Sequence, residues 1–215
     1  MINIQQINAK TMTDTRDSIL QSAISSDNSR LENLNTIADW MIDNVPWVGE
    51  ATNEKLNFIF NSPLIFGGDE AFTTAQGLIG HEADCVGQTN SFAFLAEDFD
   101  VSIAGYKTTH DSSHRVAVIN GNEPKVFDIS LCQSYKQKYG NVPENVKFMA
   151  MDEYIQRAPI DIPETMSHYG MKDNILATSK LDVPMMLSAY QDLSTIADLS
   201  DALLDLSNMD TNMEL

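Results

Sequence analysis

The clearest hydrophobic pattern of helical period begins near residue 30. In "SRLENLNTIADWMIDNV" apolar side chains recur every three or four residues, at Leu31, Leu34, Ile37 or Ala38, Met41 and Val45. This spacing predicts an α-helix with one apolar face, and Pro46 is expected to stop it because proline cannot continue the helical hydrogen bonds. "TNEKLNFIF" and "DEAFTTAQGLIG" predict two further short helices, the second with Asp69 as a candidate N-cap.

The period changes from helical to extended around residue 100. After Cys85, apolar side chains at i, i+3, i+4 and i+7 predict one more buried helix: Phe92, Leu95, Ala96 and Phe99. "VSIAGY" (101–106), "HRVAVIN" (114–120) and "KVFDIS" (125–130) then predict strands, the last two joined by a hairpin connection at "NGNEP". Strands that follow helices indicate an α+β fold rather than repeated βαβ units.

The two ends of the chain are less regular. Residues 1–30 are rich in Ser, Thr, Asn and Gln, and we expect a flexible polar leader with room for one short helix. "NVKFMAMDEYIQRA" predicts a short strand and a helix, residues 159–184 a long surface connection, and "PMMLSAYQDLSTIADLSDALLDLSNM" a final amphipathic helix. We expect a single α+β domain over residues 31–215.

Composition narrows the classes of partner. The net charge of −18, from 31 acidic and 13 basic side chains, argues against a nucleic-acid-binding protein, which needs clustered Lys and Arg. No run approaches the roughly 18 apolar residues of a membrane span. The N-terminus lacks the basic start and apolar block of a cleavable signal peptide, so a cytoplasmic location is expected. Two cysteines allow one disulfide in an oxidising compartment, but a reducing cytosol with a free thiol is the simpler interpretation.

One cysteine stands where a nucleophile would be activated. In "HEADCVGQTNSFAFLAEDFD", Cys85 opens the predicted buried helix. The positive end of a helix dipole stabilises a thiolate there, and the free backbone N–H groups can hold an oxyanion. A hairpin centred near Gly121 would place His114 and Asp128 opposite or diagonal to each other on one face. His114 would then donate Nδ1–H to Asp128 and face Cys85 with Nε2, so the sequence predicts a catalytic triad of Cys85, His114 and Asp128.

Two other assignments compete for these residues. "HDSSH" places His110 and His114 at i, i+4, and "HEADC" places His81 and Cys85 at the same spacing, which could serve zinc on a helix. The first pair lies in an expected loop and strand, and no Cys-x-x-Cys pair accompanies either, so we expect no metal and no cofactor. His110 is interpreted as a loop residue near the mouth of the site, and Cys132 as a structural thiol.

The segment "DCVGQTNSFAFLAEDFDVSIAGY…HRVAVINGNEPKVFDIS" resembles the core of the transglutaminase-like superfamily, which has a papain-like fold. In that family a cysteine opens the central helix, the next strand often ends in Gly-Tyr, and a histidine and an aspartate follow on successive strands. Cys85, His114 and Asp128 match those positions, and the similarity spans roughly residues 69–131. The chain departs from the family at Asp84, where glycine is common, and offers no clear side-chain oxyanion donor; Gln76 lies too far from Cys85 to match.

The resemblance implies a central helix carrying Cys85 packed on an antiparallel sheet, with extra helices at both ends. It also implies a cysteine-dependent acyl-transfer enzyme acting on a protein glutamine side chain or a peptide bond. Deamidation, cross-linking and proteolysis all remain open, because one triad can serve all three. The alternative is a non-catalytic partner-binding module on the same fold. The polar leader is similar to the N-termini of bacterial effectors exported by needle-type secretion, which would make a host protein the substrate; an ordinary cytosolic enzyme fits it equally. The oligomeric state is left open.

Overall fold

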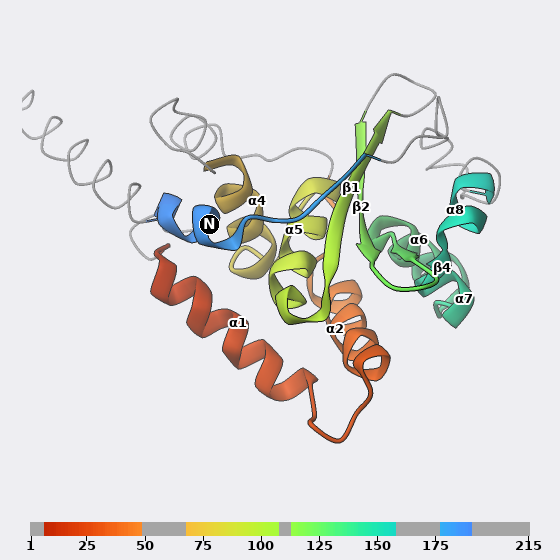
Figure 1. Ribbon diagram of the computed structural model, residues 1–215, viewed down its shortest axis with the longest axis horizontal. Coiled ribbons are helices and arrows are strands. Elements are labelled where there is room, and N and C mark those ends of the chain that lie inside the picture. The colour runs from red at the N-terminus through yellow and green to blue at the C-terminus, as the bar shows by residue number, and fades with distance from the viewer. Residues whose placement is uncertain (1–6, 49–67, 108–112, 158–176, 191–215) are drawn as a thin grey trace, which may run out of the picture.

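The computed structural model describes residues 7–48, 68–107, 113–157 and 177–190 (Figure 1). The helix expected at 52–60, the loop residue His110 and most of the expected final helix lie outside these ranges. Within them, helices lie on both sides of an antiparallel five-stranded sheet, so the predicted α+β class is confirmed. No helix of the described ranges is long and apolar enough to cross a membrane.

The first helix occupies half of the expected leader. Helix α1 (Ala9–Ala23) starts at Asn8, whose side-chain oxygen accepts the N–H of Thr11 at 2.9 Å. Its buried side chains form one stripe: Met12, Ile19, Leu20 and Ala23. The helix is therefore longer and better packed than the short one that the polar composition indicated, because four well-spaced apolar residues are enough to bury one face.

Helix α2 (Arg30–Asn44) was predicted almost residue for residue. Ser29 and Glu32 form a capping box at its start, and Val45 ends it one residue before Pro46. Most of the predicted apolar face is buried, but Leu31 is 40% exposed because it lies in the first turn, beyond the edge of the core.

Helices α4 (Gly68–Leu78) and α5 (Cys85–Leu95) pack closely enough that glycine is required. A Cβ on Gly87 would lie 2.7 Å from the Ala83 Cβ and 2.9 Å from the Thr73 backbone oxygen. Residues 87–95 of α5 are all buried, so this helix runs through the core. Asp69 lies within α4 rather than at its cap, since the helix begins at Gly68; a shift of one residue is common at helix ends.

The sheet has the strand order β4-β3-β2-β1-β5. Its strands are β1 (Val101–Lys107), β2 (Ser113–Ile119), β3 (Lys125–Phe127), β4 (Met149–Ala150) and β5 (Ala177–Ser179). The first four were predicted, although β3 is shorter than expected. Strand β5 lies inside the stretch interpreted as a surface connection, and it pairs with β1 through Ala104 and Thr178. Three residues are too few to give a period-two signal.

The two faces of the sheet carry separate cores. Side chains such as Ile103 and Ala117 belong to the larger core with α1, α2, α4 and α5, whereas Val116 and Val118 belong to the smaller one. The smaller core includes side chains from α6 (Ile129–Tyr139), α7 (Glu144–Lys147) and α8 (Met151–Arg157). Figure 1 shows these three helices on the side of β2 opposite to α5. The predicted site residues come from both sides of this boundary.

Candidate active site

Cys85 is the first residue of α5, as the sequence predicted. Asp84 caps the helix, and its Oδ1 accepts the N–H of Gly87 at 2.8 Å. Capping by a carboxylate fixes the first turn, and it explains why aspartate serves at a position where glycine is common in the resembling family. Cys85 is a free thiol and is partly exposed, at the end of an otherwise buried helix.

A contact between α5 and β2 brings this helix end to the histidine. The hydroxyl of Thr89, one turn after Cys85, donates to the backbone oxygen of Arg115 at 3.0 Å. His114 is the second residue of β2 and is 1% exposed. Cys85 lies close enough to His114 for the interaction between the two side chains to raise the pKa of the imidazole. The thiol and the imidazole are therefore neighbours although they come from different elements.

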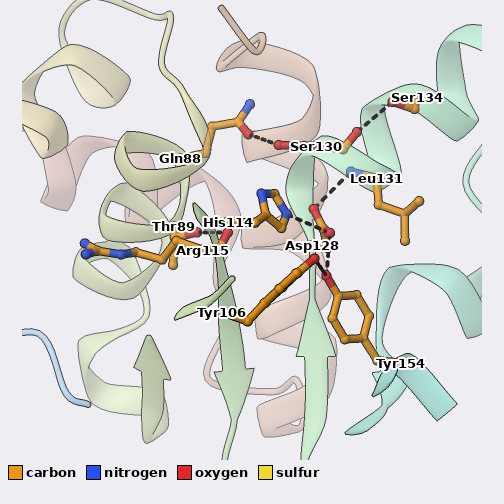
Figure 2. A network of polar contacts seen from close by, with 10 residues as sticks. All are labelled: Gln88, Thr89, Tyr106, His114, Arg115, Asp128, Ser130, Leu131, Ser134 and Tyr154. Carbon is orange, nitrogen blue, oxygen red and sulfur yellow. Dashed lines mark hydrogen bonds and ion pairs between the residues drawn. The ribbon is translucent and has the colours of Figure 1, made fainter. Parts of the chain in front are cut away.

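Asp128 lies one residue beyond β3, not on a strand. The segment 125–130 was expected to be a single strand, but Asp128 ends it by capping α6: its Oδ1 accepts the N–H of Leu131 at 3.0 Å. Val118 pairs with Val126, so Asp128 falls opposite Val116 and diagonal to His114. The two side chains share one face, and His114 Nε2 lies 3.0 Å from Asp128 Oδ2 (Figure 2).

The nitrogen that contacts Asp128 differs from the one expected. The sequence-based hypothesis assigned Nδ1 to Asp128 and Nε2 to Cys85, whereas the structure pairs Nε2 with Asp128. A diagonal partner at the end of a strand lies farther from the histidine backbone than an opposite one, so the distal nitrogen reaches it. Nδ1 is then the ring nitrogen left for Cys85.

The electrostatics of the buried pair favour a charged histidine. Burial lowers the pKa of His114, but the charge of Asp128, its hydrogen bond and the contact with Cys85 together raise this pKa to about 10. Burial likewise raises the pKa of Asp128, and the charge and hydrogen bond of His114 outweigh it, so this pKa lies below its usual range. At neutral pH the pair is therefore an imidazolium and a carboxylate.

Two tyrosines extend this network, and sequence reasoning missed both as site residues. The Tyr154 hydroxyl of α8 donates to Asp128 Oδ2 at 2.8 Å, and Tyr106 of β1 lies 3.0 Å from it, oxygen to oxygen. Tyr106 also pairs with His114 across β1 and β2, with the ring centroids 5.4 Å apart and nearly perpendicular. Tyr106 is the tyrosine of the Gly-Tyr pair in the family resemblance, which gave it no role in the site. Nothing in "MDEYIQRA" indicates that Tyr154 is part of a buried polar network.

The glutamine side chains near Cys85 either make structural hydrogen bonds or are buried. Gln88 lies three residues after Cys85, and its side-chain nitrogen donates to the Val45 backbone oxygen at 2.8 Å and to Gln133 Oε1 at 2.9 Å. Ser130 donates to its side-chain oxygen at 2.9 Å. Both amide protons of Gln88 are thus committed, which leaves backbone N–H groups at the start of α5 as the candidate oxyanion donors. Gln76 is buried in α4.

Cys132 and the histidine pairs have different surroundings. Cys132 lies inside α6 and is completely buried, and burial raises its pKa well above the usual range. His81 has a left-handed backbone, with φ 52°, before the start of α5, so His81 and Cys85 do not share a helical face. Among the described residues, no group of three or more His, Cys, Asp or Glu side chains is placed to hold a metal ion.

Comparison with known proteins finds a partial structural similarity and no similarity in sequence. No protein-family model matches this sequence, and no curated protein matches it. A solved structure described as "Crystal structure of a TGase" is similar to this chain with a TM-score of 0.39 and 12% sequence identity, over 58% of this chain. The similarity covers 33% of that protein, so this chain spans about a third of its length.

Proposed function

We propose that this chain is a cysteine-dependent acyl-transfer enzyme with a transglutaminase-like core, acting through Cys85, His114 and Asp128. The observation that carries the proposal is a partly exposed thiol at a helix start that lies close to a buried imidazole, which is itself held by a carboxylate. The three side chains supply the requirements of nucleophilic catalysis: an accessible sulfur, a proton carrier and a group that orients the carrier.

The positive charge of the His114 imidazolium supports attack by the Cys85 sulfur. A protonated imidazole stabilises the thiolate of a neighbouring cysteine. The thiolate attacks the carbonyl carbon of an amide, and the oxyanion that forms meets the N–H groups at the start of α5. The imidazolium gives its proton to the leaving nitrogen as the C–N bond breaks, which leaves an acyl thioester on Cys85.

The second half of the cycle sets the product. The neutral imidazole takes a proton from water or an amine as that molecule attacks the thioester, and the thiolate leaves. Water acting on a glutamine-derived thioester gives deamidation, an amine gives cross-linking, and water acting on a peptide-derived thioester completes proteolysis. We propose a protein as the substrate, as the resemblance to the transglutaminase-like core implies. The triad itself leaves the choice of acyl donor to the surface around Cys85.

A small activated ester tests the mechanism without a known substrate. Incubation with p-nitrophenyl acetate is expected to release p-nitrophenolate and to leave one acetyl group on the protein, located on Cys85 by peptide mass spectrometry. The Cys85→Ala and His114→Ala proteins should lose this reaction, and Cys132→Ala should retain it. A Cys85→Ala protein as reactive as the wild type would refute the mechanism.

Mass analysis of protein targets then separates the three reactions. After incubation with candidate proteins, a gain of about one mass unit indicates deamidation, coupling with loss of ammonia indicates cross-linking, and fragments indicate proteolysis. Cys85→Ala protein is the matched control in each case. If all targets stay unchanged with an enzyme that does form the acetyl thioester, the partner-binding alternative replaces this proposal.

A further inference from the structure

Asp128 has more hydrogen-bond donors than a triad requires. Oδ1 accepts the N–H of Leu131, and Oδ2 accepts both His114 Nε2 and the Tyr154 hydroxyl. Asp128 is 5% exposed, so these donors replace the water that a surface carboxylate would have. The donor from Tyr154 shares its oxygen with the imidazole, and it therefore acts on the same atom that orients His114.

The direction of the hydroxyl chain follows from counting protons. Tyr154 has one hydroxyl proton, and it is used on Asp128. Tyr106, whose hydroxyl lies 3.0 Å away, must then be the donor in the contact between the two tyrosines. The chain runs from Tyr106 to Tyr154 to the carboxylate, and each donor strengthens the next. Burial and the charge of Asp128 raise the pKa of Tyr154 well above its usual range, so the proton stays on this hydroxyl.

The same tyrosines enclose the imidazole from a second direction. The ring of Tyr106 meets the ring of His114 edge-on, and the ring centroids of Tyr106 and Tyr154 lie 6.3 Å apart. The contacts close a loop of four side chains: Tyr106, Tyr154, Asp128 and His114. A His114 ring that turned over would place a carbon atom where Nε2 bonds Oδ2 and would lose that bond, so the loop favours the orientation that leaves Nδ1 for Cys85.

We propose that Tyr154 is a positioning residue for the reaction, with Tyr106 as its support: it holds the Asp128 carboxylate so that His114 presents Nδ1 to Cys85. The inference rests on the proposed function. It adds a member from α8, a helix that lies outside the region of family resemblance. The contribution of Tyr154 is to keep Asp128 ionised and fixed, because a hydroxyl donor stabilises the charged carboxylate over the neutral acid.

Replacing the hydroxyl alone tests this role. Tyr154→Phe is expected to lower the rate of Cys85 acetylation by p-nitrophenyl acetate about 10- to 100-fold, and Tyr106→Phe to lower it less. Tyr190→Phe is the matched control, since Tyr190 is also fully buried and donates to a backbone oxygen, that of Ala71, at 2.5 Å. This control loses a comparable hydrogen bond outside the triad and should react at nearly the wild-type rate.

A spectroscopic measurement separates positioning from general loss of stability. The proton between His114 Nε2 and Asp128 should give a far-downfield NMR signal, which is expected to disappear on acidification as Asp128 becomes protonated. In Tyr154→Phe that loss should occur at higher pH than in wild type and Tyr190→Phe, because the carboxylate has lost a stabilising donor. Equal rates and equal acid limits for the two phenylalanine variants would overturn the inference.

The two proposals fail in different ways. If wild type and Cys85→Ala acetylate alike, the proposed function is wrong, and the NMR measurement alone then decides whether Tyr154 controls Asp128. If Cys85→Ala is inactive while Tyr154→Phe matches wild type in both readouts, the function stands and the role of Tyr154 is refuted.

Discussion

The Tyr154 hydroxyl and the His114 imidazole meet at one oxygen atom, Oδ2 of Asp128, at 2.8 and 3.0 Å. They reach it from different parts of the fold, α8 and β2, while the other oxygen of the carboxylate caps α6. Three elements thus depend on one buried negative charge. The stability of the protein and the reactivity of the site should respond together when that charge is altered.

The buried pair predicts a loss of stability at alkaline pH. His114 titrates near 6.5 when it is unperturbed and near 10 in the folded protein. Its contribution is therefore complete below pH 6.5 and disappears as the pH rises toward 10. We expect the free energy of unfolding in urea to fall over this range by about 1.5–3 kcal/mol more in wild type than in Asp128→Asn. Asp27→Asn, a change at an exposed carboxylate, should follow the wild-type curve.

Acid should also weaken the His114–Asp128 pair, by protonating Asp128. The pKa of Asp128 is lowered in the folded protein, so its contribution is present above its ordinary value of 3.8 and is lost as the pH falls below that value. Acid unfolding of Asp128→Asn should begin from a lower stability and show a shallower dependence on pH below 4. Parallel acid limbs for this variant and wild type would contradict the assignment of a buried, charged Asp128.

The two thiols should differ sharply in the folded state. Cys85 is partly exposed, whereas Cys132 is fully buried and its pKa is raised by burial. Iodoacetamide is expected to label the native wild-type protein once, at Cys85, and to label Cys132 only after unfolding. Cys132→Ala should therefore keep the rapid reaction that Cys85→Ala loses. Comparable labelling of both cysteines in the native protein would be inconsistent with this geometry.

Gly87 should tolerate no side chain. Its Cβ would lie 2.7 Å from the Ala83 Cβ and 2.9 Å from the Thr73 backbone oxygen, and the Thr73 oxygen belongs to the backbone of α4. Gly87→Ala is expected to destabilise the protein by about 1–3 kcal/mol and to slow acetylation of Cys85, because the helix start must move. Gly121→Ala is the control: nothing lies within 4 Å of its Cβ, and its urea midpoint should stay close to wild type.

The cap before Cys85 should contribute to both stability and reactivity. Asp84→Ala removes the acceptor for the Gly87 N–H and is expected to cost about 1 kcal/mol. Asp84→Asn keeps an acceptor oxygen and should retain most of that stability. Urea unfolding and the acetylation rate measured on the same samples would show whether the first turn of α5 must be held for Cys85 to react. Equal stability of the alanine and asparagine variants would exclude the capping role.

The parts of the structure that were predictable are those with a repeating physical signal. The apolar spacing and Pro46 located α2, and period-two alternation located β1 and β2. Helix α6 was missed because Asp128, which ends β3, also reads as a strand residue in "KVFDIS". Strand β5 was missed because a short edge strand is defined by its partner rather than by its own sequence.

The candidate site also has features that the sequence pattern predicted and features that it did not. Helix start, strand order and hairpin spacing were enough to place Cys85 at the start of a helix and to bring His114 and Asp128 onto one face. Which imidazole nitrogen faces Asp128 depends on the diagonal register of the two strands, which one residue in the turn can change. Tyr154 comes from a helix 26 residues beyond Asp128, and a contact at that separation leaves no local pattern.

The double use of Asp128, as the start of α6 and the anchor of His114, has a consequence during synthesis of the chain. Cys85 emerges from the ribosome before Asp128, the carboxylate that orients His114. Until α6 has formed and α8 has packed against the sheet, Asp128 is not fixed in place and His114 has no carboxylate to orient it. On the proposed mechanism, Cys85 would therefore gain its reactivity only after this part of the chain has folded, and a chain that ends before Asp128 would lack it.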